Sequence, residues 1–583
     1  MAGTAHPRVS GSAHHCARPY GGATCFGAVH ALLDMRMRGQ ADCAGNIEAD
    51  LAASSATSST SSAGLLLHHK YTIVFVPHRT EPCLELLRSL GTLSQVEIQD
   101  MGLEFSVLED DLLSLEDPSA WPRAFRDGDR TTLFRSAQAL MTMQSIYGVF
   151  PRVMGKGDLA NRVADLLVRQ RREVLASEPE NAAFSTHSSE IEALVVVDRG
   201  ADLVTPLCTQ LTYEGLVDEE LGIRHGFVEV EATWLGAQAQ GRTSAPLAGS
   251  TRRRQRLDGV HDALFTAIRD DNFAVVGEKL HRIARQLSAD YEGRHAAQTV
   301  QAIRAFVHRL GDLQSQHASL RLHTCLTEHL LAATKAERFH RVLEIQQDLV
   351  AGVQPSSQLE AIVDLMYEEA PVHVVLRLVC LACVMGAGVK QKWLDGVRRD
   401  LLQTYGVKYL PVLLALERVG LLRPAVRSPI ADARRVLRLI DDDVDERVPR
   451  DVSYVFSGYA PLSIRLVQTM CQREALMRRV RPTMPASGEE PAAATPVLGW
   501  NGCDESVRQL PGATFDFVQE ATPKAAADGA VKTVVVFFLG GITYAEIAAL
   551  RLMSRQTRDR RYLIATTSTI SGNSMIALLD ESS

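Results

Sequence analysis

The sequence predicts an α/β fold with a parallel sheet and a large all-helical insertion. Short runs of β-branched and aromatic residues alternate with helical patterns towards both ends of the chain, and Val531–Leu539 (VKTVVVFFL) is a strongly apolar example. Between them, from Pro206 to about Arg438, the pattern is helical almost throughout. Parallel strands need long crossover connections. The simplest architecture is therefore one sheet that is closed from both flanks of a helical insertion.

The N-terminal part of the chain predicts a curtailed first α/β domain. Residues 1–64 are rich in Ala, Gly, Ser and His, which favours a disordered or atypical segment with room for one helix at 28–37. Residues 65–111 then predict part of an α/β domain. Its elements are a strand at Tyr71–Val76, a helix at Pro82–Leu90 that stops at Gly91, and an extended stretch at Val96–Leu108.

Two distant segments, 112–205 and 440–583, predict a second, discontinuous α/β domain. The first segment contains helices between Asp129 and Arg172, a tight turn between them at Gly155–Asp158, and a strand at Ile191–Asp198. The second segment contains a loop-rich stretch at Arg481–Ala530. Its later elements are a strand at Val531–Leu539, a helix at Thr543–Ser554 and a strand at Tyr562–Thr566.

Residues 206–439 predict a helical third domain that contains a helical hairpin. A polar, arginine-rich loop is expected at Gln238–Arg256. Two apolar stripes at helical spacing follow it: Val276, Leu280, Ile283 and Leu287, then Val300, Ile303, Val307 and Leu310. The polar stretch Ala289–Thr299 between the stripes suits the bend of the hairpin. Arginines along both helices predict a basic, polar face.

Composition and charge restrict the class of protein. The chain has 583 residues and a net charge of −7, so it lacks the basic character of a nucleic-acid-binding protein. Its 10 cysteines are scattered, which favours free thiols in a reducing compartment. The most apolar helical segment, Val372–Val389, contains His373 and Arg377, so we expect a buried helix and no direct membrane insertion.

One pair of acids leaves two interpretations open. Asp198 and Asp202 follow a buried strand, where two carboxylates can bind a hard cation or act in acid–base chemistry. A nucleotide-binding α/β enzyme that uses Lys156, Asp198, Asp202 and magnesium is therefore an alternative. The favoured interpretation is structural, with Asp198 paired with Arg199 or capping a neighbouring helix.

Three further motifs favour structural roles. Gly155-Lys156-Gly157 lacks the Ser or Thr that a phosphate-binding loop needs after its lysine. Cys380 and Cys383 form a single CxxC pair in an apolar helix, without a second pair for zinc. Asp441–Glu446 (DDDVDE) lacks the glycine and the glutamate of a calcium loop, which favours a solvated acidic turn. We therefore expect no cofactor and no metal.

Several long sequence blocks resemble the SM (Sec/Munc-type) family of SNARE-binding proteins. Val195–Gly222 reads VVVDRGADLVTPLCTQLTYEGLVDEELG, and TLFRSAQALMTMQSIYGVFPRVMGKG, SYVFSGYAPLSIRLVQ and FFLGGITYAEIAALRLMS are further blocks of the series. The TPLCTQLTYEGLVDE portion is similar to the vacuolar-sorting class C branch, the SM subunit of the HOPS and CORVET tethers. The resemblance extends from Tyr71 to Leu579. The sequence differs from the family pattern before Leu65, because SM proteins have a fuller first α/β domain there.

The resemblance implies an arch of parallel-sheet α/β domains with a helical third domain, and a function without catalysis. An SM protein of this branch acts as a chaperone of SNARE helices during vesicle docking and fusion. Its implied partners are a Qa-SNARE, an R-SNARE and the long scaffold subunit of the class C tethering core. The implied location is cytoplasmic, peripheral on endosome and vacuole or lysosome membranes through these partners. A structural tether subunit without SNARE contact is a further alternative.

The resemblance also assigns two binding segments in the third domain. The hairpin, Tyr291–Thr324, is the implied SNARE-binding element. Its candidate residues are Tyr291, Arg294, Arg304, His308 and Arg321. The amphipathic segment Arg398–Leu410 is the candidate for binding the scaffold subunit. Its candidate residues are Arg398, Tyr405, Val407 and Leu410.

Overall fold

The structure of the protein is a computed structural model. It describes residues 71–75, 79, 81–91, 93, 96–179, 181–235, 252–257, 259–296, 300–425, 428–472, 498–500, 504–523, 531–557 and 559–580, with the backbone alone at 71, 289–313, 504 and 506. The predicted disordered segment 1–64, with its possible helix, lies outside these residues. The chain divides into two compact units, Met1–Ser106 with Leu115–Asp117, and Val107–Ser114 with Pro118–Ser583.

The first unit contains the predicted strand–helix–strand. Strands β1 (Tyr71–Phe75) and β2 (Val96–Asp100) pair in parallel, and helix α4 (Glu81–Ser89) connects them. Cys83 and Leu87, one helical turn apart, are the buried residues of α4. The single extended stretch predicted at 96–108 is wrong in one respect, because β2 ends at Asp100 and β3 (Ser106–Glu109) is a separate strand.

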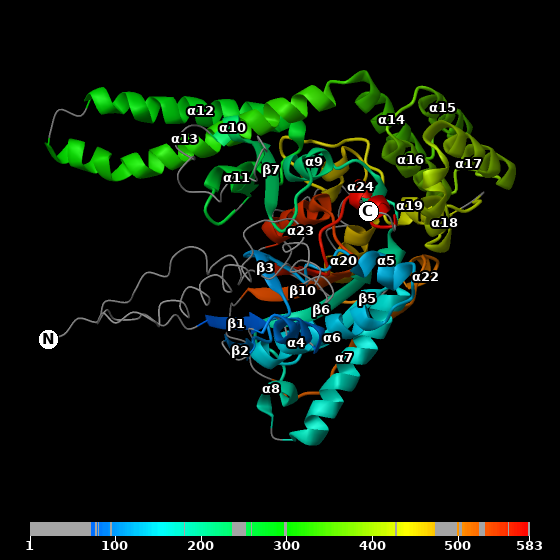
Figure 1. Ribbon diagram of the computed structural model, residues 1–583, viewed down its shortest axis with the longest axis horizontal. Coiled ribbons are helices and arrows are strands. Elements are labelled where there is room, and N and C mark those ends of the chain that lie inside the picture. The colour runs from blue at the N-terminus through cyan, green and yellow to red at the C-terminus, as the bar shows by residue number, and fades with distance from the viewer. Residues whose placement is uncertain are drawn as a thin grey trace, which may run out of the picture. The chain divides into compact units, whose positions relative to one another are not determined.

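The second unit is built on a seven-stranded sheet with the strand order β3-β4-β11-β10-β6-β5-β9 (Figure 1). The strands besides β3 are β4 (Leu112–Ser114), β5 (Arg152–Lys156), β6 (Ile191–Asp198), β9 (Thr514–Val518), β10 (Lys532–Leu539) and β11 (Arg560–Thr566). From β4 to β5 the neighbours pair in parallel, whereas β9 pairs antiparallel with β5. Strands from before and after the helical region thus form one sheet, as predicted.

The central strands explain why this sheet is stable. Val195, Val196 and Val197 of β6 are fully buried, and so are Val534, Val535 and Val536 of β10. A strand that is covered on both faces needs such a continuous apolar run. Helix α7 (Asp158–Ser177) packs on β5 and β6, and α23 (Tyr544–Gln556) packs on β11. The other helices of this α/β region are α5 (Ala120–Phe125), α6 (Thr131–Tyr147), α8 (Ala182–Ser185), α20 (Leu462–Cys471), α22 (Asp504–Arg508) and α24 (Gly572–Ala577).

Gly155 and Lys156 lie in strand β5, so the turn predicted between two helices is wrong at these residues. A Cβ at position 155 would lie 2.1 Å from the carbonyl oxygen of Val196 in the neighbouring strand. The glycine is therefore explained by the close approach of two strands and the Phe515 ring, rather than by a turn.

Besides β5, the strands β7, β8 and β9 were missed in regions predicted as helix or loop. β7 (Phe227–Glu231) pairs antiparallel with β8 (Arg252–Arg256), which lies within the predicted arginine-rich loop. Glu229 faces Arg254 across this pair, so opposite charges permit a strand of such polar composition. β9 likewise lies in the stretch predicted to be loop-rich.

The region between β6 and η6 (Val452–Phe456) is otherwise helical. Its α-helices are α9 (Tyr213–Glu220), α10 (Ala232–Leu235), α11 (Ala263–Ile268), α12 (Phe273–Ala296), α13 (Val300–Thr334), α14 (Glu337–Ala351), α15 (Pro355–Tyr367), α16 (Val372–Met385), α17 (Gln391–Tyr405), α18 (Leu410–Arg418) and α19 (Pro429–Val436). Short 3-10 turns are η2 (Arg199–Ala201), η3 (Thr205–Leu207) and η5 (Val407–Tyr409). The division at residues 205 and 440 into domains stays a prediction.

Helix α16 has the buried environment that was predicted for it. Every residue from Val375 to Met385 is buried, including both cysteines of the CxxC pair. Burial raises the pKa of Cys383 to about 11. Arg377 is accommodated because its guanidinium pairs with Glu219 at 2.6 Å. None of the helices in the described ranges combines the length and hydropathy that a membrane-spanning helix needs.

Candidate functional site

The junction after β6 contains the two acids of the enzyme alternative, and the first of them caps a helix. Asp198 Oδ2 accepts hydrogen bonds from the amides of Leu159 (2.8 Å) and Ala160 (3.1 Å) in the first turn of α7. Gly157 precedes that turn, and a Cβ there would lie 2.1 Å from the Asp198 carboxylate. Burial raises the pKa of Asp198. Helix capping is therefore confirmed as the role of Asp198.

The pairing of Asp198 with Arg199 is wrong, because Arg199 pairs with a residue of another element. Its guanidinium forms two hydrogen bonds with Glu546 of α23, at 2.9 and 2.7 Å, and neither side chain is exposed. Asp202 accepts from the amides of Val204 (3.1 Å) and Ser463 (2.8 Å). Asp198 therefore accepts from backbone amides of α7, and Asp202 accepts from backbone amides of the turn after β6 and of α20.

Lys156, the third residue of the enzyme alternative, is also engaged in the fold. Its ammonium donates to the carbonyl oxygen of Gly512 (2.6 Å) and to the hydroxyl of Thr514 (3.0 Å). Burial lowers the pKa of Lys156 to about 8. These contacts hold the end of β5 to Gly512 and to the first residue of β9, and give Lys156 a structural role.

The capping role predicts a stability effect. Asp198→Ala is expected to lower the free energy of unfolding by about 1–2 kcal/mol, because two amides of α7 lose their acceptor. Urea denaturation followed by circular dichroism would measure the change, with Asp165→Ala on the exposed face of the same helix as the control. A nucleotide affinity that disappears in a variant of unchanged stability would contradict the capping role.

The predicted hairpin corresponds to helices α12 and α13, which pack against each other and extend side by side (Figure 1). Of the first predicted stripe, Val276, Leu280 and Leu287 are buried, which confirms an apolar seam on α12. The predicted bend is shorter than expected, because α12 continues to Ala296 and α13 begins at Val300. The connection at 297–299 lies outside the described residues.

The five candidate SNARE-binding residues lie at different positions along this helical pair. Tyr291 and Arg294 are in the last turns of α12, and Arg304 and His308 are in the first turns of α13, in the part where only the backbone is described. Arg321 lies much farther along α13. Its guanidinium donates to the carbonyl oxygen of Thr233 in α10 (2.8 Å), which places it beside the base of the pair rather than the tip.

The four candidate scaffold-binding residues separate into two kinds. Arg398 forms ion pairs with Glu417 and Asp395, and half-buried Tyr405 donates its hydroxyl to the carbonyl oxygen of Ala370 (2.5 Å). Val407 and Leu410, in contrast, are 70% and 41% exposed.

A third exposed apolar residue, Leu414, lies near Val407 and Leu410 in the chain. It is 48% exposed and was not among the candidates predicted from the sequence. The spacing of 3 and 4 residues places Val407, Leu410 and Leu414 on one face of η5 and α18. We call this face the α18 patch. It contains three apolar side chains in contact with solvent, whereas Arg398 and Tyr405 make polar contacts within the fold.

Comparison with models of protein families identifies the family of this chain. The model of the Sec1 family matches residues 46–577. The chain belongs to the Sec1 family. The match confirms the resemblance found from the sequence blocks, and it includes both the sheet and the helical region.

Curated relatives of this Sec1-family chain come from the vacuolar-sorting branch. Vacuolar protein sorting-associated protein 33A of Rattus norvegicus is 37% identical over 516 residues, which cover 87% of this chain and 81% of the relative. The vacuolar protein-sorting-associated protein 33 homolog of Arabidopsis thaliana is 32% identical and covers 88% and 81%. The branch inferred from the sequence is thereby confirmed.

Solved structures confirm the fold of the Sec1-family chain. The SM protein Vps45 in complex with the Qa-SNARE Tlg2 gives a TM-score of 0.54 at 17% identity, covering 88% of this chain and 81% of that one. The Unc18–syntaxin 1 complex from Monosiga brevicollis gives 0.56 at 14% identity, covering 88% and 82%. At these identities the likeness establishes the predicted fold class, parallel-sheet α/β with a large helical region.

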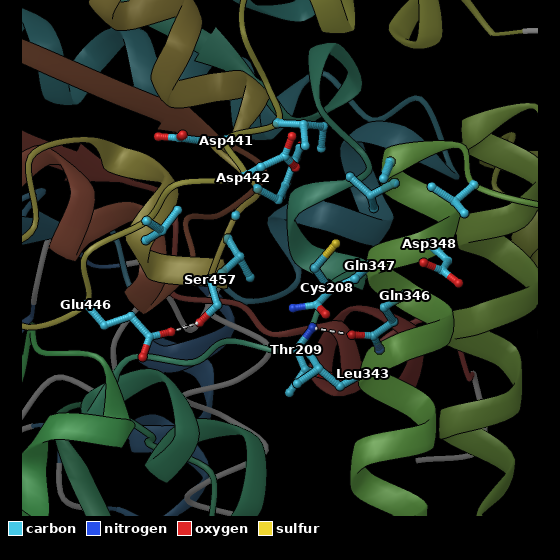
Figure 2. A pocket seen from close by; sticks show the side chains of 18 residues that line it. Cys208, Thr209, Leu343, Gln346, Gln347, Asp348, Asp441, Asp442, Glu446 and Ser457 are labelled. Atoms are coloured by element: carbon cyan, nitrogen blue, oxygen red, sulfur yellow. Dashed lines mark hydrogen bonds between the residues drawn. The ribbon is translucent and has the colours of Figure 1, made fainter.

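The acidic turn of the Sec1-family chain borders a cavity of about 480 Å³ between α14 and residues 440–459 (Figure 2). Asp348, Asp441, Asp442 and Glu446 contribute carboxylates to its lining. Ser457 donates its hydroxyl to Glu446 (2.6 Å), and the amide of Thr209 donates to Gln346 (2.9 Å). Within the described ranges, no group of three or more His, Cys, Asp or Glu side chains is arranged to hold a metal ion.

Proposed function

We propose that this Sec1-family chain is a non-enzymatic chaperone of SNARE helices in transport from endosomes to the vacuole or lysosome. In this proposal it is the SM subunit of a HOPS- or CORVET-type tether, and reaches the membrane surface through its partners. Relatives named for vacuolar protein sorting, together with the SNARE complexes formed by structural neighbours, support this assignment.

One observation carries the proposal, the long helical pair α12–α13. Residues 314–318 on α13 are all exposed, and the backbone of the pair remains helical on both sides of 297–299. A paired helix surface of this length can accept another amphipathic helix through anchors spaced by three and four residues. The candidate residues Tyr291, Arg294, Arg304 and His308 belong to the far part of this pair, which we assign to SNARE contact.

The mechanism that follows is alignment before zippering. Formation of the first turn of a helix is entropically costly, and alignment of two chains adds a further entropic cost. A surface that holds a Qa-SNARE and an R-SNARE in register removes part of this cost before they meet. The basic side chains of the pair would set the orientation and association rate of the bound helix and contribute on the order of 0.5–1 kcal/mol each to its affinity.

The α18 patch is the proposed contact with the long scaffold subunit of the tether. Its three exposed apolar side chains share one helical face by their spacing, while Arg398 is paired with acids of its own chain. Apolar residues that become fully covered at the centre of an interface contribute most of its binding free energy. Val407 and Leu410 are therefore retained as contact candidates, whereas Arg398 and Tyr405 are assigned to the support of the patch.

Fluorescence anisotropy with labelled Qa- and R-SNARE segments tests the SNARE proposal. The variant Arg294→Glu with Arg304→Glu is expected to bind about tenfold more weakly, since each reversed charge changes a solvent-screened contact by on the order of 0.5–1 kcal/mol. The matched control is Arg162→Glu with Arg172→Glu on the exposed face of α7, which makes the same change in net charge.

The outcomes separate the alternatives. Equal weakening in the control would indicate an effect of net charge and contradict a site on the hairpin. An absence of binding by the folded chain would contradict the SNARE proposal for the isolated protein and favour a structural tether subunit. Stoichiometric nucleotide binding would favour the enzyme alternative.

A further inference from the structure

A chain of hydrogen bonds holds α13 to the two helices that it passes near its base. Asp262 is the N-cap of α11, where its carboxylate accepts from the amide of Phe265 (3.0 Å). The same carboxylate accepts from the hydroxyl of Ser319 (2.7 Å) and lies 3.1 Å from Nε2 of His323. Nδ1 of His323 in turn lies 2.8 Å from the hydroxyl of Tyr213 in α9. We call Tyr213, Asp262, Ser319 and His323 the base network.

His323 is the centre of the base network, and its surroundings fix the ring. The side chain has no exposed surface. Phe265 stacks on the imidazole with ring centroids 5.6 Å apart, and Tyr213 meets it edge-on at 5.8 Å. Because an ionised carboxylate can only accept, Nε2 donates to Asp262, and in the neutral ring Nδ1 accepts from Tyr213. The imidazole is thus held in one orientation by polar contacts on two edges and an aromatic ring on its face.

The base network lies where α13 changes from exposed to buried. Residues 314–318 are exposed, Ser319 and Leu320 are half-buried, and Leu322 and His323 are buried. Ser319 and His323 are one helical turn apart, so Asp262 is bonded to two successive turns at this point. The fixed end of the projecting part of α13 is therefore defined by these contacts.

The length of the projecting part makes its direction sensitive to small changes at this point. From Ser319 back to Val300 the helix extends about 28 Å at 1.5 Å per residue. A rotation of about 10° at the base would move the far end sideways by about 5 Å, roughly half the diameter of a helix. A sideways shift of this size is enough to change which side chains of a bound helix meet those of α13.

We propose that the base network, Tyr213–His323–Asp262–Ser319, is a positioning element that fixes the direction in which the helical pair leaves the body. Its consequence for SNARE helices rests on the proposed function: a fixed direction keeps the contact surface in one position and lowers the ordering cost of binding. None of the four residues needs to touch the SNARE helix, and each acts through α13.

Distance measurements by electron paramagnetic resonance test the proposal without a ligand. Spin labels are attached at position 301 in the first turn of α13 and at exposed Ala267 in α11. They are attached through a non-natural amino acid, because a thiol-reactive label would also modify the partly exposed Cys325. The wild-type chain is expected to give one narrow distance distribution. Tyr213→Phe and His323→Phe, which keep the rings and remove the polar contacts, are expected to broaden or shift it by about 5 Å.

The matched control is Thr324→Ala, which removes an exposed hydroxyl that donates to Leu320 of its own helix. It is expected to leave the distribution unchanged. Near-ultraviolet circular dichroism confirms that each variant is folded, and Ser319→Ala replaces His323→Phe if the latter does not fold. An unchanged distribution in folded Tyr213→Phe and His323→Phe, or equal broadening in Thr324→Ala, would overturn the inference.

The same variants then enter the anisotropy assay with SNARE segments. Their affinity is expected to fall at least about fivefold, because a mobile surface must be ordered on binding. Unchanged affinity together with a broadened distribution would contradict the link between direction and binding. If the wild-type chain binds no SNARE segment, the proposed function fails, while the distance measurement still decides whether the base network positions the pair.

Discussion

Arg199→Ala is expected to lower the free energy of unfolding by about 3–5 kcal/mol, because it leaves Glu546 charged and without its partner in the interior. The two side chains have no exposed surface and share hydrogen bonds of 2.9 and 2.7 Å. Glu546 also closes the capping box of α23 with Thr543 and accepts from Ser463. The pair therefore joins the turn after β6, helix α20 and helix α23 at one point.

Urea denaturation of the variant measures this effect, and a second variant identifies its cause. Arg199→Met with Glu546→Leu is expected to recover part of the loss, since a buried charge is no longer left unpaired. Arg169→Ala, which breaks an exposed pair with Glu173 on α7, is the control and should cost less than about 0.5 kcal/mol. A loss below about 1 kcal/mol in Arg199→Ala would contradict the proposed role of the pair.

The pair also predicts a dependence on pH. Burial alone would raise the pKa of Glu546, but the charge and hydrogen bonds of Arg199 hold it below its usual range. A carboxyl group whose pKa is lowered in the folded state stabilises the fold above its unfolded pKa. That contribution is present at neutral pH and is lost as the pH falls through the folded pKa of Glu546. The stability difference between wild type and the double variant should therefore shrink on acidification.

Val407→Asp with Leu410→Lys is expected to weaken binding of the long scaffold subunit by at least about 100-fold while leaving the fold intact. Charges placed in the covered centre of an interface cost several kcal/mol, whereas exposed positions tolerate polar side chains in the free chain. Val407 and Leu410 are 70% and 41% exposed, so polar side chains at these positions should be tolerated in the free chain. Calorimetric titration of the purified scaffold subunit would measure the affinity.

A matched control for the α18 patch uses exposed apolar residues elsewhere. Val436→Asp with Leu331→Lys changes side chains that are 52% and 40% exposed, on α19 and α13. It is expected to bind the scaffold subunit as the wild type does. Unchanged affinity in the patch variant, with thermal unfolding equal to that of wild type, would contradict the assignment of the patch.

The strands that the sequence predicted well are those whose pattern needs no tertiary information. β6, β10 and β11 are apolar runs that suit burial on both faces. β8 (RRRQR) has no such pattern and becomes a strand because β7 provides opposite charges and buried Val228 and Val230. β5 is short and lies between two helices, so its glycine was interpreted as a turn.

The candidate site was predictable to the level of segments rather than of single side chains. The spacing of Val276, Leu280 and Leu287 predicted one helix of the hairpin, since periodicity alone requires a buried face. Whether Arg398 or Val407 faces solvent depends on Glu417 and on α18, which no local pattern reveals. The role of His323 was invisible for the same reason, because its partners come from α9 and α11.

The pairing of β6 with β10 has a consequence for synthesis on the ribosome. About 330 residues separate the end of β6 from the start of β10, and translation at about 5–20 residues per second needs roughly 20–70 seconds to produce them. Throughout that interval one edge of β6, with its valine run, has no strand to pair with, which is the condition that invites association between nascent chains. The helical region is translated completely within the same interval. The nascent chain thus carries an unpaired strand edge beside apolar side chains until β10 emerges, and a premature stop before β10 would leave that edge unpaired permanently.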